Sequence, residues 1–115
     1  MKLSLSVRVA EALSKTSLNV PFADILTLAV AHGYQGVCLR ASAGGVQTSR
    51  SDLVAMRQQV EAAGVVVSMV TADFDVPLNN AQGPTSLRDI GPSLDVAEAL
   101  GCDLIRVCLK QQSDI

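Results

Sequence analysis

The chain has 115 residues, the size of one domain, with a net charge of −2 and a sequence pI of about 5.1. Apolar residues make up 49% of it and aromatic residues 3%, so its core must be aliphatic. This balance argues against the basic surface of proteins that bind nucleic acid or anionic membranes. Because neither a signal peptide nor an apolar run of about 20 residues is recognisable, we expect a cytoplasmic protein.

The first apolar run, residues 2–9, predicts a β-strand. After a polar stretch, Pro21 stands where proline commonly opens a helix. Apolar side chains then repeat at helical spacing, and Gly33 predicts the end of this helix. The stripe consists of Phe22, Ile25, Leu26 and Ala29.

The second apolar run, residues 36–40, predicts a second strand, and a loop of small residues follows it. Ser49 or Ser51 can cap the next helix. Gly64 predicts its end. The apolar stripe of this helix consists of Leu53, Met56, Val60 and Ala63.

The third run, residues 65–71, predicts a buried strand. Residues 74–86 are rich in Pro, Asn and Gly, and we expect a mobile lid over the site there, with a passive surface loop as the alternative. Pro92 lies inside the last helical pattern, so this helix should kink or start afresh. A fourth strand is predicted at residues 103–109. The last helical stripe consists of Leu87, Ile90, Leu94, Ala97 and Leu100.

The predicted order is βαβαβαβ. Helices between strands imply right-handed crossovers and a parallel sheet. The turns before the strands are short and centred on glycine, whereas the loops after the strands are long. Long loops after strands place the functional face at the carboxyl ends of the strands.

Alternation places an arginine at the end of three strands. In the first and second runs, small or polar residues at every second position lead up to Arg8 and Arg40, and in the fourth run Arg106, Cys108 and Lys110 alternate with apolar residues. The third run is apolar on both sides, so its orientation stays open. We expect the apolar face to meet the helices and the mixed face to line a barrel interior or cleft.

Arginines on an inner face require anionic partners, because a guanidinium keeps its charge when buried. One interpretation is a site for phosphate, carboxylate or a polyhydroxylated substrate. The alternative is internal ion pairing with carboxylates of the protein. The candidate substrate-binding residues are Arg8, Glu11, Arg40, Ser42, Asp73, Arg106 and Lys110.

The sequence lacks the motifs of histidine-dependent catalysis, nucleotide binding and cysteine metal sites. The single histidine, His32, sits in the last turn of a predicted helix, where a structural role is expected. The sequence has no phosphate-binding loop and no dinucleotide fingerprint. A receiver-type domain would need acidic residues where the first strand ends in Arg8. The three cysteines, Cys38, Cys102 and Cys108, have no metal spacing and are expected to be reduced.

Three segments resemble one family of barrels. Residues 2–11 look like its opening strand, residues 32–40 (HGYQGVCLR) are similar to its second strand, and residues 94–107 (LDVAEALGCDLIRV) look like its approach to strand four. The family is the xylose-isomerase-like TIM barrels, which include sugar phosphate isomerases and epimerases. The resemblance implies an α/β fold, a partial (β/α)8 TIM barrel of about four βα units. A full barrel takes about 250 residues, so residues 1–115 would be its N-terminal half, a single incomplete domain.

This resemblance implies an isomerase or epimerase acting on a sugar or sugar phosphate by metal-assisted proton transfer next to a carbonyl. The base and the ligands of the divalent metal would lie in the C-terminal half, so the chain alone should be inactive. Cys38 stands where the family often has an acid, which puts the role of that acid in doubt. The related endonuclease-IV-like branch has histidine zinc ligands after strands two and three, and this chain has none there.

Two other functions stay open: a non-catalytic module of the same barrel family that binds a small ligand, and a complete small flavodoxin-like domain. The expected partner is a small sugar or sugar phosphate, with neither nucleic acid nor membrane. Self-association is also expected, because a four-stranded piece of a barrel leaves two open sheet edges.

Overall fold

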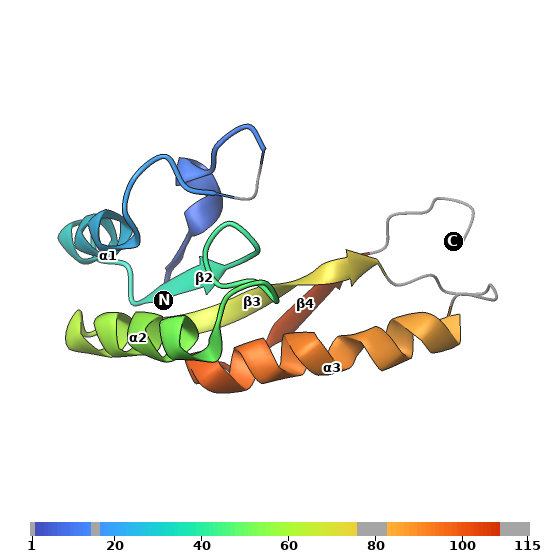
Figure 1. Cartoon of the computed structure of the whole chain (residues 1–115). Coiled ribbons are helices and arrows are strands. Elements are labelled where there is room, and N and C mark those ends of the chain that lie inside the picture. The colour runs from blue at the N-terminus through green and yellow to red at the C-terminus, as the bar shows by residue number, and fades with distance from the viewer. Residues whose placement is uncertain (1, 15–16, 76–82, 109–115) are drawn as a thin grey trace.

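The computed structural model describes residues 2–14, 17–75 and 83–108, with the backbone alone for 73–75, 83–89 and 108. Four parallel strands form one sheet in the order of the sequence, as the predicted βαβαβαβ pattern requires (Figure 1). The strands are β1 (Ser4–Ser6), β2 (Gly36–Leu39), β3 (Val66–Asp75) and β4 (Ile105–Cys108).

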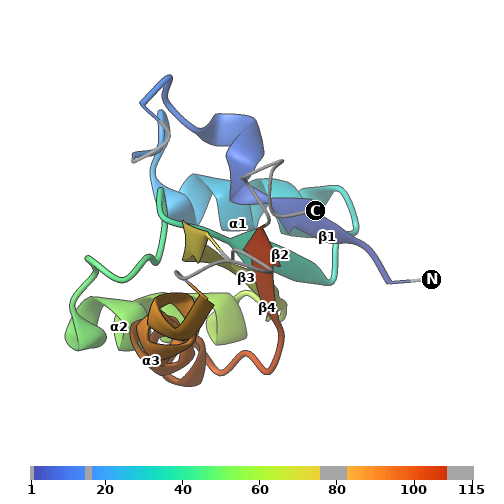
Figure 2. The same ribbon diagram turned by 90° about the vertical axis from the view of Figure 1, so that its right-hand side faces the viewer.

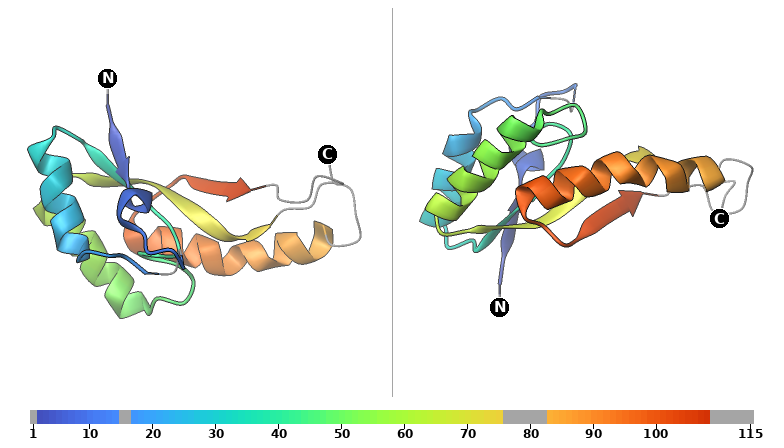
Figure 3. Two further views of the ribbon diagram at one scale, coloured as in Figure 1. Left: turned by 90° about the horizontal axis from the view of Figure 1, so that it is seen from above. Right: turned by 60° about the horizontal axis from the view of Figure 1, so that its bottom comes forward.

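Three α-helices connect the strands, and a short 3-10 helix follows β1. Helices α2 and α3 lie side by side along the sheet (Figures 1 and 2), and α1 lies beside α2 (Figure 3). No helix in the described part of the chain is long and apolar enough to cross a membrane. The helices are η1 (Val7–Ala10), α1 (Phe22–Ala31), α2 (Arg50–Ala62) and α3 (Gly83–Leu100).

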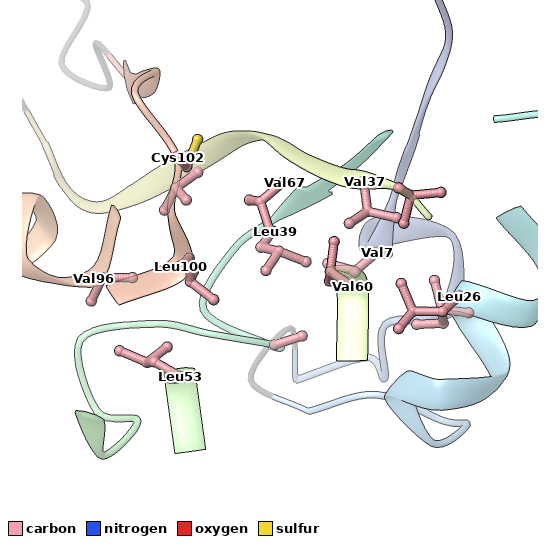
Figure 4. Close-up of a cluster of buried hydrophobic side chains, with 14 of the residues drawn as sticks. Val7, Leu26, Val37, Leu39, Leu53, Val60, Val67, Val96, Leu100 and Cys102 are labelled. Carbon is pink, nitrogen blue, oxygen red and sulfur yellow. The ribbon is translucent and has the colours of Figure 1, made fainter. Parts of the chain in front are cut away.

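The core lies between the sheet and the helices. The strands direct Leu5, Val37, Leu39, Val67 and Val70 toward the helices, and all five side chains are buried. Figure 4 shows Leu39 and Val67 of the sheet above Leu53, Val96 and Leu100 of the helices. This helix-covered face confirms the apolar face predicted for β1 and β2. The opposite face, called the open face below, carries Ser4, Ser6, Cys38, Ser68, Met69, Thr71 and Arg106.

Strand β3 contains a bulge that the apolar sequence concealed. Val37 pairs with Val67, but the next residue, Cys38, pairs with Met69, so Ser68 is the extra residue. An extra residue reverses the alternation of the strand. This reversal keeps Val70 on the same buried side as Val67. The bulge therefore settles the orientation that the sequence left open.

The first strand is shorter than the predicted residues 2–9. The side chain of Ser6 accepts a hydrogen bond from the backbone N–H of Arg8, which starts the 3-10 turn of η1. Val7 is buried at this turn. The prediction that Arg8 continues the face of Ser4 and Ser6 along one extended strand is therefore wrong.

The first two helix starts follow the sequence. Pro21 precedes α1, and the Ser49 side chain caps α2 by accepting the N–H of Asp52 at 3.2 Å. Gly33, Gly64 and Gly101 have φ values of 79°, 78° and 70°. Only glycine adopts this left-handed conformation readily, so these residues end the helices where predicted.

Helix α3 runs without interruption from Gly83 to Leu100, so it does not start afresh at Pro92, and the kink that was the other expectation stays a prediction. Pro92 is exposed, so its ring lies outside the core. Leu94 of the predicted stripe is 51% exposed, and Val96 is buried instead.

The long loop predicted at residues 74–86 is also shorter. Strand β3 continues to Asp75 and α3 begins at Gly83. The remainder of the predicted lid, residues 76–82, lies outside the described residues. The fourth strand is likewise shorter than residues 103–109, and it begins at Ile105.

Candidate functional site

Three predicted site residues meet where β1 and β2 end. Nε of Arg40 lies 3.1 Å from Oε2 of Glu11, and Oγ of Ser42 donates a hydrogen bond to the same oxygen at 2.7 Å. The Glu11 side chain is 5% exposed and the Arg40 side chain is 25% exposed. We call Glu11, Arg40 and Ser42 the rim cluster.

The loops after the two strands bring these side chains together. After η1 the chain folds back on itself, so that Glu11 pairs with Leu18 in an antiparallel bridge and the N–H of Asn19 donates to the carbonyl of Ala10 at 2.7 Å. After β2, the N–H of Ala43 donates to the carbonyl of Arg40 at 2.8 Å. This tight turn directs Ser42 toward Glu11.

Burial explains why Glu11 has two partners. A carboxylate removed from water is costly unless charged or polar donors compensate for the lost hydration. Among the carboxylate side chains that the structure describes, only that of Glu11 is buried. Arg40 and Ser42 provide this compensation, so the internal ion pair considered for Arg40 is present.

The ion pair uses only part of the Arg40 guanidinium. Its Nε faces Glu11, and no described residue provides an acceptor for its two Nη groups. The planar Nη edge of an arginine matches the geometry of a phosphate or carboxylate. Arg40 can therefore be fixed by Glu11 and still bind an anion.

Strand register places Arg106 in the same row as Arg40. Leu39 pairs with Val70, and Val70 pairs with Ile105. One residue further along, Thr71 pairs with Arg106, and Arg40 is the first residue after β2, so the same register extended by one residue aligns the three. Two strand spacings correspond to about 10 Å between the first and last backbones of this row. Arg106 is exposed and has no ion-pair partner among the described residues.

The other predicted site residues do not join the rim cluster. Arg8 lies on η1 and is exposed, with no described carboxylate in ion-pair distance. Asp73 belongs to β3, and its side chain is outside the described atoms. Lys110 lies outside the described residues altogether.

Sequence reasoning missed a polar cluster in the middle of the open face. Oγ of Ser4 donates to Oγ of Ser68 at 2.7 Å, and Ser68 donates to the carbonyl of Val37 at 3.2 Å. Sγ of Cys38 lies 3.4 Å from the same Ser68 oxygen. Only the bulge brings Ser68 to this position. Serine in an apolar run was the available signal, but the sequence does not show the bulge.

Gly36 makes room for this cluster. A Cβ atom at this position would lie 2.8 Å from Oγ of Ser4 and 3.2 Å from Cβ of Ser68. Both distances are shorter than ordinary van der Waals contact. Glycine is thus required here by the close approach of its neighbours.

A groove of about 480 Å³ lies between the loops after β1 and β2. Its apolar lining includes Phe22 and Met56, and its polar lining consists of Ser17, Ser42, Gln47, Thr48 and Asp52. No described arginine or lysine lines it. Binding of an anion is therefore expected at the rim cluster and not in the groove, although Ser42 belongs to both.

The described residues do not form a metal site. No group of three or more His, Cys, Asp or Glu side chains converges in the part of the chain that the structure describes. His32 caps the end of α1 through its backbone, as its predicted structural position suggests.

Cys38 and Cys102 are free thiols. Sγ of Cys102 donates to the carbonyl of Leu104 at 3.3 Å. Burial raises the pKa of the Cys102 thiol, because desolvation disfavours the thiolate.

Several solved structures share the fold of this chain. The probable 3-DHS dehydratase AsbF of petrobactin synthesis from Bacillus anthracis matches with a TM-score of 0.69 and 17% identity, over 93% of this chain and 38% of that chain. A xylose isomerase-like TIM barrel/4-hydroxyphenylpyruvate dioxygenase fusion protein matches with a TM-score of 0.65 and 20% identity, over 99% of this chain and 17% of that chain. The AP endonuclease, family 2, from Brucella melitensis matches with a TM-score of 0.64 and 13% identity, over 95% of this chain and 41% of that chain.

No protein-family model and no curated protein matches the chain. The chain spans well under half of each of these structures, and identities of 13% to 20% establish the fold alone. Their different names show that this fold supports several chemistries. The chain thus has the fold of the xylose-isomerase-like TIM barrels, over part of such a barrel.

Proposed function

We propose that this chain forms the substrate-binding part of a sugar phosphate isomerase or epimerase. Arg40 is the observation that carries the proposal. Its Nε is held by a buried carboxylate at 3.1 Å, and its Nη edge has no acceptor among the described residues. The resemblance of the sequence to barrel isomerases selects the sugar phosphate class.

In this proposal Arg40 binds the phosphate or another oxyanion of the substrate. Glu11 is a positioning residue, because its Oε2 already forms an ion pair with Arg40 and accepts a hydrogen bond from Ser42. Holding the guanidinium in one orientation reduces the entropy lost on binding. Arg106, in the same row, would contribute a second positive charge about 10 Å away, near another part of the substrate.

Proton transfer next to the carbonyl needs a base, and a divalent metal would assist it. The described residues do not form a metal site, so we assign no step through a metal to them. The proposal places base and metal ligands in residues other than those described.

Calorimetric titration with ribose 5-phosphate tests the binding part of the proposal. We expect Arg40→Ala to weaken binding by about 10-fold to 100-fold, because a charged hydrogen-bonded pair is lost. Arg40→Lys should recover only part of this loss, since lysine cannot reproduce the planar edge. Arg50→Ala is the matched control, because Arg50 forms only an exposed ion pair with Glu98 at 3.6 Å.

Equal affinities of the wild type, Arg40→Ala and Arg50→Ala would contradict the assignment. Ribose and inorganic phosphate, titrated separately, show which part of the ligand is recognised. We expect phosphate to compete and ribose alone to bind more weakly.

Binding without turnover is the second candidate function. The only buried carboxylate side chain among those described is already paired with Arg40, and is thus poorly suited to be the base. If ribose 5-phosphate binds but the complete protein converts neither it nor related sugar phosphates, this candidate is favoured.

A further inference from the structure

The groove between the loops after β1 and β2 has walls that are held by hydrogen bonds on both sides. In the first loop, the Asn19 side chain donates to the carbonyl of Glu11 at 3.3 Å. In the second loop, the N–H of Thr48 donates to the carbonyl of Gly45 at 3.0 Å. Walls that are already in place reduce the cost of ordering them when a ligand binds.

Gly44 anchors the second wall on the hydrophobic core. It is buried and has a φ of 96°, which only glycine adopts readily. A Cβ atom at this position would lie 3.4 Å from the Leu100 side chain and 3.5 Å from the Met56 side chain. The loop therefore lies directly against these side chains, and this part of the groove belongs to the packed structure.

The groove is bounded by the first two βα units alone. Strands β1 and β2 pair directly with each other, and the lining residues come from the loops after these strands and from α1 and α2. The lining uses neither edge of the sheet. It is therefore independent of what adjoins β4 or the outer side of β1.

The lining combines apolar and polar side chains. Leu18, Phe22 and Met56 are half-buried, whereas Gln47 and Asp52 are exposed. Small-molecule sites commonly have apolar walls with a few polar groups and a volume of roughly 300–1,000 Å³, and this groove has about 480 Å³. A sugar ring matches such a lining, because its C–H faces are apolar and its hydroxyl groups lie around its edge.

The polar groups of the lining favour a ligand that donates hydrogen bonds. Ser42 donates its own hydroxyl proton to Glu11, so its oxygen can only accept from a ligand. Asp52 has no ion-pair partner among the described residues, and its carboxylate also only accepts. Its negative charge disfavours an anion, and a cation would gain little from one exposed carboxylate. An uncharged ligand with several hydroxyl groups therefore fits best.

From these observations we propose that the groove is a second binding site, which takes an uncharged sugar ring. Ser42 and Asp52 accept hydrogen bonds from its hydroxyl groups, and its C–H face packs on Phe22 and Met56. The site does not include Arg40. The inference thus goes beyond the sugar phosphate chemistry proposed above and does not depend on it.

An NMR titration with methyl β-D-glucopyranoside, an uncharged sugar, tests the site. We expect the backbone N–H signals of Gly44 and Thr48 to shift in a saturable manner. Asp52→Asn keeps the size of the side chain and should raise the dissociation constant by about 3-fold to 10-fold, because the charged acceptor is lost. Asp24→Asn is the matched control and should have no effect, since Asp24 is the exposed carboxylate in the first turn of α1 and lies outside the groove.

A second variant keeps the test valid if Asp52→Asn fails to fold. Thr48→Val keeps the shape of the side chain but removes its hydroxyl group, and should raise the dissociation constant by about 2-fold to 5-fold. Inorganic phosphate, added separately, should leave the Gly44 signal in place whether or not it binds Arg40, which separates this site from the rim cluster. Absence of a saturable shift with the sugar, no effect of either groove variant, or an equal effect of Asp24→Asn would overturn the proposal.

Discussion

The two faces of the sheet differ in how their side chains are held. On the helix-covered face, Leu39, Val37 and Val70 are buried among aliphatic side chains of the helices (Figure 4). On the open face, Ser4, Ser68 and Cys38 interact through hydroxyl and thiol groups. The first face contributes mainly to folding, whereas the second leaves polar groups available to a ligand or partner.

This comparison predicts unequal effects of truncation on stability. Leu39→Ala should reduce the free energy of unfolding by about 2–5 kcal/mol, because Leu39 is fully buried. Met69→Ala, on the open face and half-buried, should cost about 1 kcal/mol or less. Urea denaturation measures both values. Equal losses would contradict the difference between the two faces.

The rim cluster should contribute less to stability than the core. Glu11→Gln keeps the size of the side chain but removes the negative charge that pairs with Arg40 and strengthens the hydrogen bond from Ser42. We expect a loss of about 2 kcal/mol in the free energy of unfolding. Ser42→Ala should cost about 1 kcal/mol, since only one hydrogen bond is lost. Denaturation of the two single variants and the double variant would measure the coupling, and simple additivity would contradict a shared cluster.

Gly36→Ala tests the close packing on the open face. The added methyl group would lie 2.8 Å from Oγ of Ser4, so we expect a loss of about 1–2 kcal/mol. Ser4→Gly in the same chain removes the nearest atom and should recover part of the loss. Thermal melts of the three variants are sufficient. No recovery in the double variant would show that Ser68 or the backbone of Val66 determines the effect.

The cysteines should differ modestly in reactivity. The thiolate is the reactive form, and burial raises the pKa of Cys102, so less thiolate is present at a given pH. We expect iodoacetamide to modify Cys102 more slowly than Cys38 at pH 8, as measured by peptide mass spectrometry. Any stability gained from the neutral Cys102 thiol is present below the ordinary value of 9.0 and is lost as the pH rises through the raised pKa. Faster modification of Cys102 would contradict this burial.

The sequence predicted the order of elements because periodicity, caps and glycine turns are local signals. Ser49, Gly33 and Gly64 are examples whose roles depend only on neighbouring residues. The sequence also predicted that Arg40 and Ser42 lie at one edge of the sheet, since residues after parallel strands share that edge, and their role in binding a substrate stays a prediction. The sequence left open whether Arg40 forms an internal ion pair or binds a substrate, and only the tertiary structure shows that it pairs with Glu11.

Other features depend on contacts that the sequence does not show. The bulge at Ser68 shifts the register of β3 against β2, and a uniformly apolar run gives no sign of it. The turn at η1 follows from a side-chain hydrogen bond of Ser6, which competed with the extended strand that alternation predicted. Helix α3 continues through Pro92, although proline lacks the N–H that the interior of a helix uses.

The central claim is that Arg40 is held by Glu11 and still presents its guanidinium to an anion. An NMR titration that observes arginine side-chain Nε–H signals while ribose 5-phosphate is added tests it most directly. We predict that the Arg40 signal shifts in a saturable manner and that the Arg50 signal stays in place. Glu11→Gln should broaden the Arg40 signal and weaken the response. An Arg40 signal that does not move at saturating ribose 5-phosphate would contradict the claim.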